Sequence, residues 1–395
     1  MKNYLSLLPC FLIPIFFLVQ TAIAFDLQLQ QKLIIPNGEG SNWFGRRIII
    51  DNDYAFISAT GVSVEGRGAQ GMVYVFKKKA NFWELSQELT SGGGNDRFGR
   101  SLAIQGPILV VGANQNVGRA HVYKKIGGKY VKVKTLTIPE GHENASIGWC
   151  VDTNGDFIIV SAPSFNVGDQ MKAGSVFVFK KVDGDWSLIQ KLIEPDGQAG
   201  NKFGIYAAIS ENTLAVSSLM SDRAGAVYLY SIRNGKWILQ QRLNGTASPR
   251  HYFGNPLRFF GGQLYVGATG YGEKKSGSVM IYSKINGSWV QSQIISPSNS
   301  NDAARFGGDF SVHENVLAVG ALRETYNQKK EMGVVYLYKK KKKKWFEIKK
   351  LFSPDGGERD EFGHLAVSQE TLIVGAAFHS VGTRKHQGAA YVFSY

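Results

Sequence analysis

Glycine-led runs of aromatic and aliphatic residues recur along the chain at a nearly constant interval. The runs are largely apolar on both faces, so each predicts a strand that is buried on both sides. Repetition of this kind indicates a ring or array of similar units. The seven runs are GMVYVF (71–76), GRAHVY (118–123), GSVFVF (174–179), GAVYLY (225–230), GSVMIY (277–282), GVVYLY (333–338) and GAAYVF (388–393).

Two shorter motifs recur once in each unit, in step with these runs. A Phe-Gly pair, replaced by Ile147-Gly148 in the third unit, opens the units near residues 44, 98, 147, 203, 253, 306 and 362, with spacings of 49 to 56 residues. We expect its Phe to wedge between adjacent sheets. A pair of small residues ends each second strand, as expected where backbones crowd near an axis. These pairs are Ser58-Ala59, Gly112-Ala113, Ser161-Ala162, Ser217-Ser218, Gly267-Ala268, Gly320-Ala321 and Gly375-Ala376.

Each unit reads as four short antiparallel strands. Tight-turn signals such as Asp183-Gly184 and Asn234-Gly235 separate the third strand from the fourth. In six units an aromatic residue then begins the fourth strand, and we expect it to pack between blades. These residues are Trp83, Tyr130, Trp186, Trp237, Trp289 and Trp345. Four strands per unit predict an all-β fold, a seven-bladed β-propeller.

The last unit stops after its third strand. Residues 29–34 match the fourth-strand endings around Gln190-Lys191-Leu192 and Gln241-Arg242-Leu243. We therefore predict that residues 26–36 supply the outer strand of the seventh blade and close the ring, because an open array would need polar capping units at both ends. On this interpretation residues 25–395 form one domain.

The cycle of Phe-Gly, then Val-Gly-Ala, then Gly-x-Val-Tyr-Val-Phe resembles the FG-GAP repeats of integrin α-subunit propellers, with bacterial secreted FG-GAP proteins as the closest likeness. The resemblance covers essentially all of residues 26–395. It implies a non-enzymatic binding or adhesion scaffold. The family's inserted and leg domains are not visible, so a receptor role does not carry over.

Calcium sites are a second departure from that family. Integrin-like propellers carry Asp-x-Asp-x-Asp-Gly loops between strands one and two, and calcium requires six to eight oxygen ligands. The corresponding loops here are short turns, and only the third, with Asp152 and Asp156, offers more than one or two oxygen side chains. We predict no structural calcium, no other metal and no cofactor.

The N-terminus predicts export. Lys2, an apolar stretch from Leu5 to Val19 and the small residues of Ala22-Ile23-Ala24 form a secretory signal peptide over residues 1–24. A retained membrane anchor is the alternative, although roughly twenty apolar residues are needed to span a bilayer. The mature protein would be secreted, periplasmic or attached to the cell surface. It would retain only Cys150, which we interpret as a small buried hydrophobe rather than a reactive thiol.

The binding surface is expected where the 2–3 loops (between strands two and three) and the 4–1 loops (between successive blades) share one face of the disc. Aromatic residues, arginines and histidines on these loops fit a recognition surface; variable solvent loops are the alternative. The candidates are Arg67, Phe165, Tyr271, Arg323, Tyr326, Phe378, His379 and His386. His379 and His386 have no third ligand at a convincing spacing, so we assign no metal site.

The opposite face is basic. The chain carries 45 Lys and Arg against 31 Asp and Glu, and its charge of +14 falls to +13 without Lys2. Much of the excess lies in the hairpins between strands three and four. One interpretation is a solvated rim that blocks edge pairing; the other is an anion-binding face, for which nucleic acid is the weakest ligand. The residues are Lys77, Lys78, Lys79, Lys124, Lys125, Lys180, Lys181 and Lys339, Lys340, Lys341, Lys342, Lys343, Lys344.

No signature of a catalytic site is present. The HExxH, GxSxG, P-loop and dinucleotide-binding motifs are all missing from the sequence. We therefore predict a protein that is not an enzyme and that recognises a protein or surface-glycan partner. A lectin-like propeller is the main alternative, and a propeller hydrolase or lyase is a weaker one.

Overall fold

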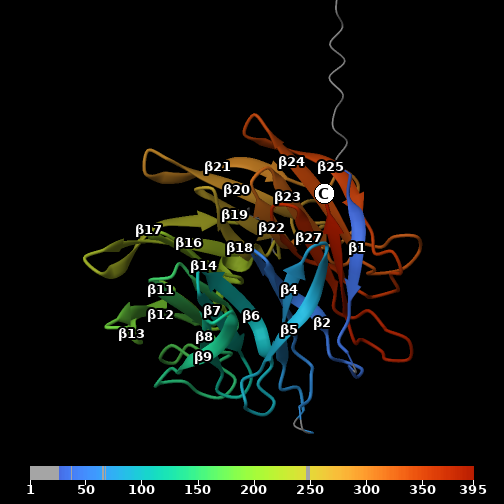
Figure 1. The fold of residues 1–395 in the computed structure, drawn as a ribbon. Helices are drawn as coiled ribbons and strands as arrows, with labels where there is room; N and C mark the ends of the chain where they lie inside the picture. The colour runs from blue at the N-terminus through green and yellow to red at the C-terminus, as the bar shows by residue number, and fades with distance from the viewer. Residues whose placement is uncertain (1–25, 37, 65, 67, 246–249) are drawn as a thin grey trace, which may run out of the picture.

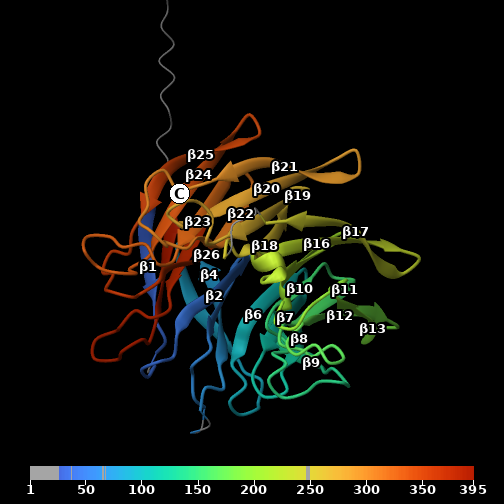
Figure 2. The same ribbon diagram turned by 180° about the vertical axis from the view of Figure 1, so that it is seen from behind.

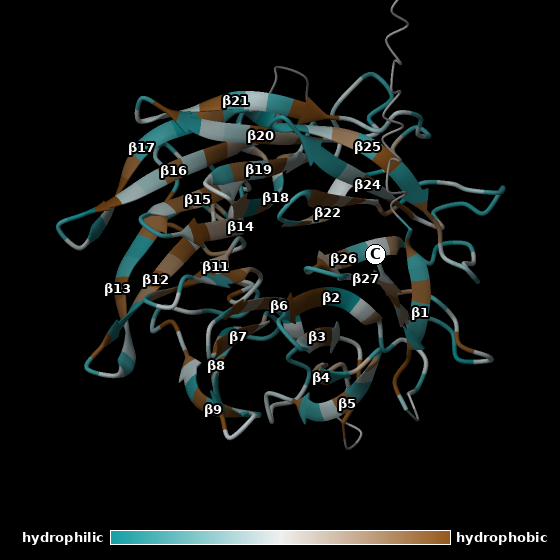
Figure 3. Cartoon of the chain, turned by 45° about the horizontal axis from the view of Figure 1, so that its top comes forward, coloured by the Kyte–Doolittle hydropathy of each residue, from teal (hydrophilic) through white to brown (hydrophobic). Residues whose placement is uncertain are grey.

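The computed structural model describes residues 26–36, 38–64, 66, 68–245 and 250–395. Across these residues the strands form seven four-stranded antiparallel sheets arranged as a ring (Figures 1 and 2). When the top of the molecule is turned toward the viewer, the sheets are seen to radiate from a common centre (Figure 3). The prediction of a seven-bladed all-β propeller is confirmed.

Each of the first six blades consists of four consecutive strands. Blade one contains β2 (Phe44–Asp51), β3 (Tyr54–Ala59), β4 (Met72–Lys79) and β5 (Phe82–Leu89). Blade two contains β6 (Phe98–Gln105), β7 (Ile108–Ala113), β8 (Arg119–Ile126) and β9 (Lys129–Leu136). Blade three contains β10 (Val151–Thr153), β11 (Phe157–Ala162), β12 (Ser175–Val182) and β13 (Asp185–Ile193).

The later blades repeat this order. Blade four contains β14 (Phe203–Ser210), β15 (Thr213–Ser218), the short helix η1 (Ser221–Arg223), β16 (Ala226–Arg233) and β17 (Lys236–Asn244). Blade five contains β18 (Phe253–Phe260), β19 (Gln263–Ala268), β20 (Ser278–Ile285) and β21 (Ser288–Ile295). Blade six contains β22 (Phe306–His313), β23 (Val316–Ala321), β24 (Val334–Lys341) and β25 (Lys344–Leu351).

The seventh blade joins the two ends of the described chain. It contains β26 (Phe362–Val367), β27 (Thr371–Ala376) and β28 (Ala389–Ser394), and its outer strand is β1 (Gln28–Leu33). β1 runs antiparallel to β28, with Gln28 opposite Ser394 and Leu33 opposite Ala390. Figure 1 shows this blue strand beside the red C-terminal strands. The predicted closure by residues 26–36 is therefore confirmed.

The repeated motif residues pack between blades as expected. The aromatic residues that begin the fourth strands are all buried, and so are Ile147 and the Phe of each Phe-Gly pair. Phe44, for example, lies in a core cluster that combines residues of blades one and seven. A Cβ on Gly71 would come within 2.3 Å of the carbonyl oxygen of Phe98 in the next blade, so only glycine fits there.

A glutamine pairs the fourth strands of neighbouring blades. The Gln31 side chain donates to the carbonyl of Trp83 at 3.0 Å and accepts from its N–H at 2.8 Å. Gln87, Gln190, Gln241 and Gln293 form the same pair of hydrogen bonds with the aromatic residue of the following blade. We call this arrangement the glutamine clasp. Because Gln31 forms it, β1 acts as an ordinary fourth strand.

Candidate functional site

The first strand of each blade lines a central channel, because these seven strands contact one another around the axis. Two cavities of about 650 and 630 Å³ lie along this channel and share Arg47, Tyr206 and Gly308 at their junction. Backbone hydrogen bonds show which loops surround each end. The N–H of Lys78 in a 3–4 hairpin donates to Asp53 of a 1–2 turn, whereas Arg97 of a 4–1 loop donates to Ala69 of a 2–3 loop. The predicted sharing of faces is confirmed.

A buried carboxylate marks the junction of the two cavities. Asp309 of β22 lies 3.2 Å from Arg258 of blade five, 3.9 Å from Arg47 of blade one and 3.5 Å from His364 of blade seven. Burial opposes ionisation of Asp309, but these cationic and polar neighbours lower its pKa to about 2. This group therefore connects four blades and serves the structure of the ring.

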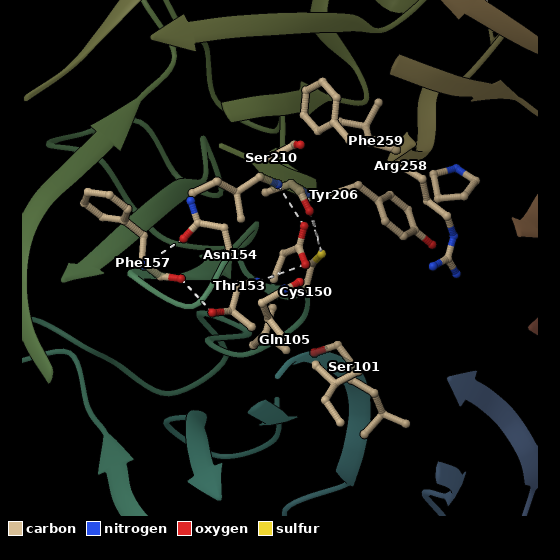
Figure 4. Close-up of a pocket in the computed structure, with 18 of the residues that line it drawn as sticks. Ser101, Gln105, Cys150, Thr153, Asn154, Phe157, Tyr206, Ser210, Arg258 and Phe259 are labelled. Carbon is tan, nitrogen blue, oxygen red and sulfur yellow. Dashed lines mark hydrogen bonds between the residues drawn. The ribbon is translucent and has the colours of Figure 1, made fainter. Parts of the chain in front are cut away.

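The cavity on the side of the 1–2 turns contains a carboxyl and a thiol (Figure 4). Asp152 accepts hydrogen bonds from the N–H groups of Ile209 and Thr153, yet burial raises its pKa to about 6. The Cys150 sulfur lies 3.4 Å from the carbonyl of Ala207, and burial raises the pKa of its thiol to about 11. Cys150 is only partly buried and lines this cavity, which corrects the interpretation of Cys150 as a buried hydrophobe.

That thiol is poorly suited to nucleophilic catalysis. A thiolate is the reactive form of cysteine, and a raised pKa keeps Cys150 protonated at neutral pH. None of the described residues that line this cavity is a histidine that could remove its proton. Cys150 is therefore not an activated nucleophile in this structure.

The cavity at the other end of the channel is strongly cationic. Loops of the 2–3 and 4–1 type and the inner strands bring six arginines and one lysine to its wall, against a single carboxylate, Glu361. We call this cavity the arginine mouth. Its cationic residues are Arg46, Arg47, Arg100, Arg250, Lys275, Arg305 and Arg323.

An aromatic cluster adjoins the arginine mouth at the junction of blades seven and one. The rings of Trp43 and Phe378 lie 6.4 Å apart edge to face, and His386 lies 5.8 Å from Phe378. The guanidinium of Arg46 lies 5.8 Å from both large rings, and that of Arg97 lies 5.8 Å from Trp43. We call these five residues the Trp43 cluster; Trp43 and Phe378 are partly buried, while Arg97 and His386 are exposed.

Two residues predicted as exposed binding groups are buried, so that part of the prediction is wrong. Phe165 is 3% exposed and packs edge to face on Phe177, because its loop folds back over blade three. His379 is 6% exposed and holds the Asp360 carboxylate at 2.6 Å and the Lys32 amine at 3.0 Å. Both residues contribute to packing in this structure, and a role in binding stays a prediction.

The other predicted residues occupy different positions on the same face. Tyr326 stacks on Phe352 at 3.7 Å, and Tyr271 packs edge to face on His251, so both are partly buried. Arg323 lies 3.7 Å from both Glu331 and Glu361 in the wall of the arginine mouth. The structure thus brings Phe378 and His386 together, whereas Tyr271 packs against a core cluster of blades four and five. Arg67 lies outside the described residues.

The predicted basic residues all lie at or beside the 3–4 hairpins. Most are exposed, while Lys78, Lys125 and Lys340 are partly buried. Lys125 lies 3.8 Å above the ring of Tyr54, and Lys340 donates to the Gln263 side chain. Anion binding by this face stays a prediction.

In the 1–2 turn of blade three, a polar side chain forms hydrogen bonds with the backbone of the turn. Asn154 accepts hydrogen bonds from the N–H groups of Asp156 and Phe157, which closes the turn of blade three. The part of the chain that the structure describes contains no group of three or more His, Cys, Asp or Glu side chains that could hold a metal ion. The expectation of a calcium-free protein is therefore kept as a proposal.

The sequence interpretation overlooked the residues that flank the Phe-Gly pairs. Trp43, Arg97 and Arg305 directly precede such a pair, and Arg46 and Arg100 follow one. Since the first strand is innermost in its blade, residues beside its start lie near the axis. The position of these residues beside the Phe-Gly pairs was therefore a signal in the sequence that could have identified them as channel residues.

The sheets and the channel define the class of this protein, a seven-bladed β-propeller. The FG-GAP repeat family model matches residues 186–230 and 345–393, each spanning one fourth strand and the first three strands of the following blade. Two segments of the propeller are thus similar to FG-GAP repeats, which are typical of extracellular proteins. No curated protein shows significant similarity to the chain. Within the described residues, no helix has the length and apolar character required to cross a membrane.

Proposed function

We propose that this protein is an exported, non-enzymatic scaffold that binds a protein partner through the face formed by the 2–3 and 4–1 loops. The single observation that carries the proposal is the Trp43 cluster. It combines partly exposed aromatic rings with arginines, the residue types that dominate binding energy in protein interfaces. Side chains from blades seven, one and two build it, so the closed ring fixes its shape.

Export is part of the same proposal. FG-GAP repeats are typical of extracellular proteins, which supports a partner outside the cell. The proposed signal peptide over residues 1–24 lies outside the described residues. Comparison of the mass of the mature protein with that of the full chain tests this point, because cleavage after Ala24 leaves Phe25 as the first residue.

Site-specific photo-crosslinking tests the binding face. A photoreactive amino acid at position 378 is expected to crosslink a surface or extracellular protein of the source organism, and Trp43→Ala is expected to reduce the yield about tenfold or more. Phe346 provides the matched control, because it is an aromatic residue that is 50% exposed beside a 3–4 hairpin. Equal crosslinking from positions 378 and 346 would contradict the proposal.

A lectin remains the second candidate from sequence, and a glycan array separates it from a protein binder. Repeated sugar sites would need similar polar and aromatic residues in several blades. The Trp43 cluster is instead formed at one blade junction, since Ser146, Lys202 and Glu361 occupy the position of Trp43 in other units. This irregularity favours one unique partner surface.

A further inference from the structure

The arginine mouth lies at the centre of the same face but differs in chemistry from the Trp43 cluster. Seven cationic side chains and one carboxylate line it. They come from β2, β6 and the loops that precede or belong to blades five and six, so the mouth exists only in the closed ring. A surface lysine run is explained by solubility, whereas converging charges in a concave site require another explanation.

Most of these charges have no carboxylate partner. Arg323 lies 3.7 Å from Glu331 and Glu361, and Arg47 lies 3.9 Å from Asp309 at the floor. Among the described residues, Arg46, Arg100, Arg250, Lys275 and Arg305 form no ion pair with a carboxylate. The mouth therefore carries a large uncompensated positive charge.

Like charges held close together are unfavourable in this site. Burial, followed by the neighbouring charge of Arg47, lowers the pKa of the Arg100 guanidinium to about 9. The pKa values of Arg46 and Arg305 are lowered for the same two reasons, with Arg47 and Arg323 as the respective charged neighbours. All three side chains still carry a proton at neutral pH, so an anion would relieve the repulsion.

Aromatic contacts hold two of the guanidinium groups in place. Arg100 stacks on Trp149 at 3.7 Å, and Arg46 is held beside Trp43 and Phe378. Such contacts orient the planar guanidinium while its N–H groups remain available. Tyr206 and Tyr252 line the same cavity and add phenol groups that can donate hydrogen bonds.

We propose that the arginine mouth binds a compact, multiply phosphorylated small molecule. Planar guanidinium groups match the geometry of phosphate oxygens, and several of them suit a ligand with several negative charges. A volume of about 630 Å³ fits a small molecule rather than a long polymer. This inference goes beyond the proposed function, because the ligand site and the partner surface use different side chains apart from Arg46.

Isothermal titration calorimetry with inorganic tripolyphosphate tests the site. We expect saturable binding of one ligand per chain at physiological ionic strength. Arg100→Gln and Arg305→Gln are each expected to weaken binding about tenfold. Arg359→Gln is the matched control, because Arg359 is exposed on the same face and does not line the mouth. Its affinity is expected to equal that of the wild type.

Several outcomes overturn the proposal. Lack of tripolyphosphate binding by the wild type does so directly, and an equal loss in Arg359→Gln would indicate unspecific attraction to a basic protein. Citrate binding as tightly as tripolyphosphate would assign the site to carboxylates instead. Binding of a long polyanion alone would exclude a small ligand.

Two further measurements separate folding and partner effects from ligand binding. Tripolyphosphate should raise the melting temperature of the wild type by more than that of Arg305→Gln, because the variant is expected to bind it about tenfold more weakly. The Arg305 side chain is exposed, so we expect the variant to fold. His386→Ala, which changes an exposed member of the Trp43 cluster that does not line the mouth, should retain tripolyphosphate binding even if it weakens partner crosslinking. Failure of one proposal is therefore distinguishable from failure of the other.

Discussion

At the scale of single residues, the channel contains one buried carboxylate with cationic neighbours and several arginines that have few acidic neighbours. Asp309 is surrounded by Arg258, Arg47 and His364, and its pKa is lowered to about 2. The arginines of the mouth have few acidic neighbours. The first arrangement stabilises the ring through a buried charge group, whereas the second leaves charge available for a ligand.

The Asp309 group makes stability sensitive to acid. The folded-state pKa of Asp309 lies below its unfolded value of about 3.9, so its contribution of about 2 kcal/mol is present above pH 4 and lost as the pH falls toward 2. Burial also lowers the pKa of His364, which acts in the same direction below about pH 6.5.

Asp309→Asn is expected to destabilise the protein at pH 7 by about 2 kcal/mol, because Arg47 and Arg258 lose their counter-charge. Urea unfolding between pH 7 and pH 3 measures the effect. Asp185→Asn is the control, since that carboxylate is 61% exposed and its pairing with Lys134 contributes little. An acid dependence of Asp309→Asn as steep as that of the wild type would contradict the assignment.

At the scale of secondary-structure elements, β1 provides the hydrogen bonds and the side-chain contacts of a fourth strand. It pairs with β28 over its length, and Gln31 forms the glutamine clasp with Trp83. Lys32 adds an ion pair with Asp355 at 2.5 Å and a contact with His379. β1 therefore contacts blade one through Gln31, and it contacts blade seven and the loop that precedes it through Lys32.

Deletion of residues 25–35 is expected to lower the melting temperature by about 10 °C or more, because it exposes the edge of β28 and removes one clasp. Differential scanning calorimetry measures this change. Gln31→Ala and Gln241→Ala serve as matched variants, each losing two hydrogen bonds at one junction and about 1–2 kcal/mol. An unchanged melting temperature after the deletion would refute the role of β1.

At the scale of the whole molecule, seven similar blades create a symmetric frame whose two faces carry different chemistry. Lysines dominate the 3–4 hairpins, while arginines converge on the channel at the other face. The frame depends on glycine and buried aromatic contacts between neighbouring sheets. The residues that hold the ring together are therefore largely separate from those of the proposed binding sites.

Because the sheets themselves hold the ring, we expect no dependence on divalent metal. Addition of a calcium chelator should leave the melting temperature unchanged within about 1 °C, since no ligand binding to the folded state is removed. Thermal scans with chelator and with added calcium measure this. A substantial decrease with chelator, restored by calcium, would show that the family's metal sites persist here.

Sequence repetition was sufficient to predict the blades because each motif residue has a packing role in every unit. Phe44 and Gly71, for example, are confined by neighbouring sheets. The burial of Phe165 and His379 could not be predicted in this way, because it depends on how an individual loop folds over its blade. The arginine mouth was missed because residues distant in sequence converge only when the ring is closed.

The pairing of Gln30 with Ser394, 364 positions apart, also determines the order in which the molecule can be completed during synthesis. Six sheets can form as the chain is made, but β1 cannot pair until β28 has been synthesised. A polypeptide that stops before β28 would thus leave β1 without its partner strand.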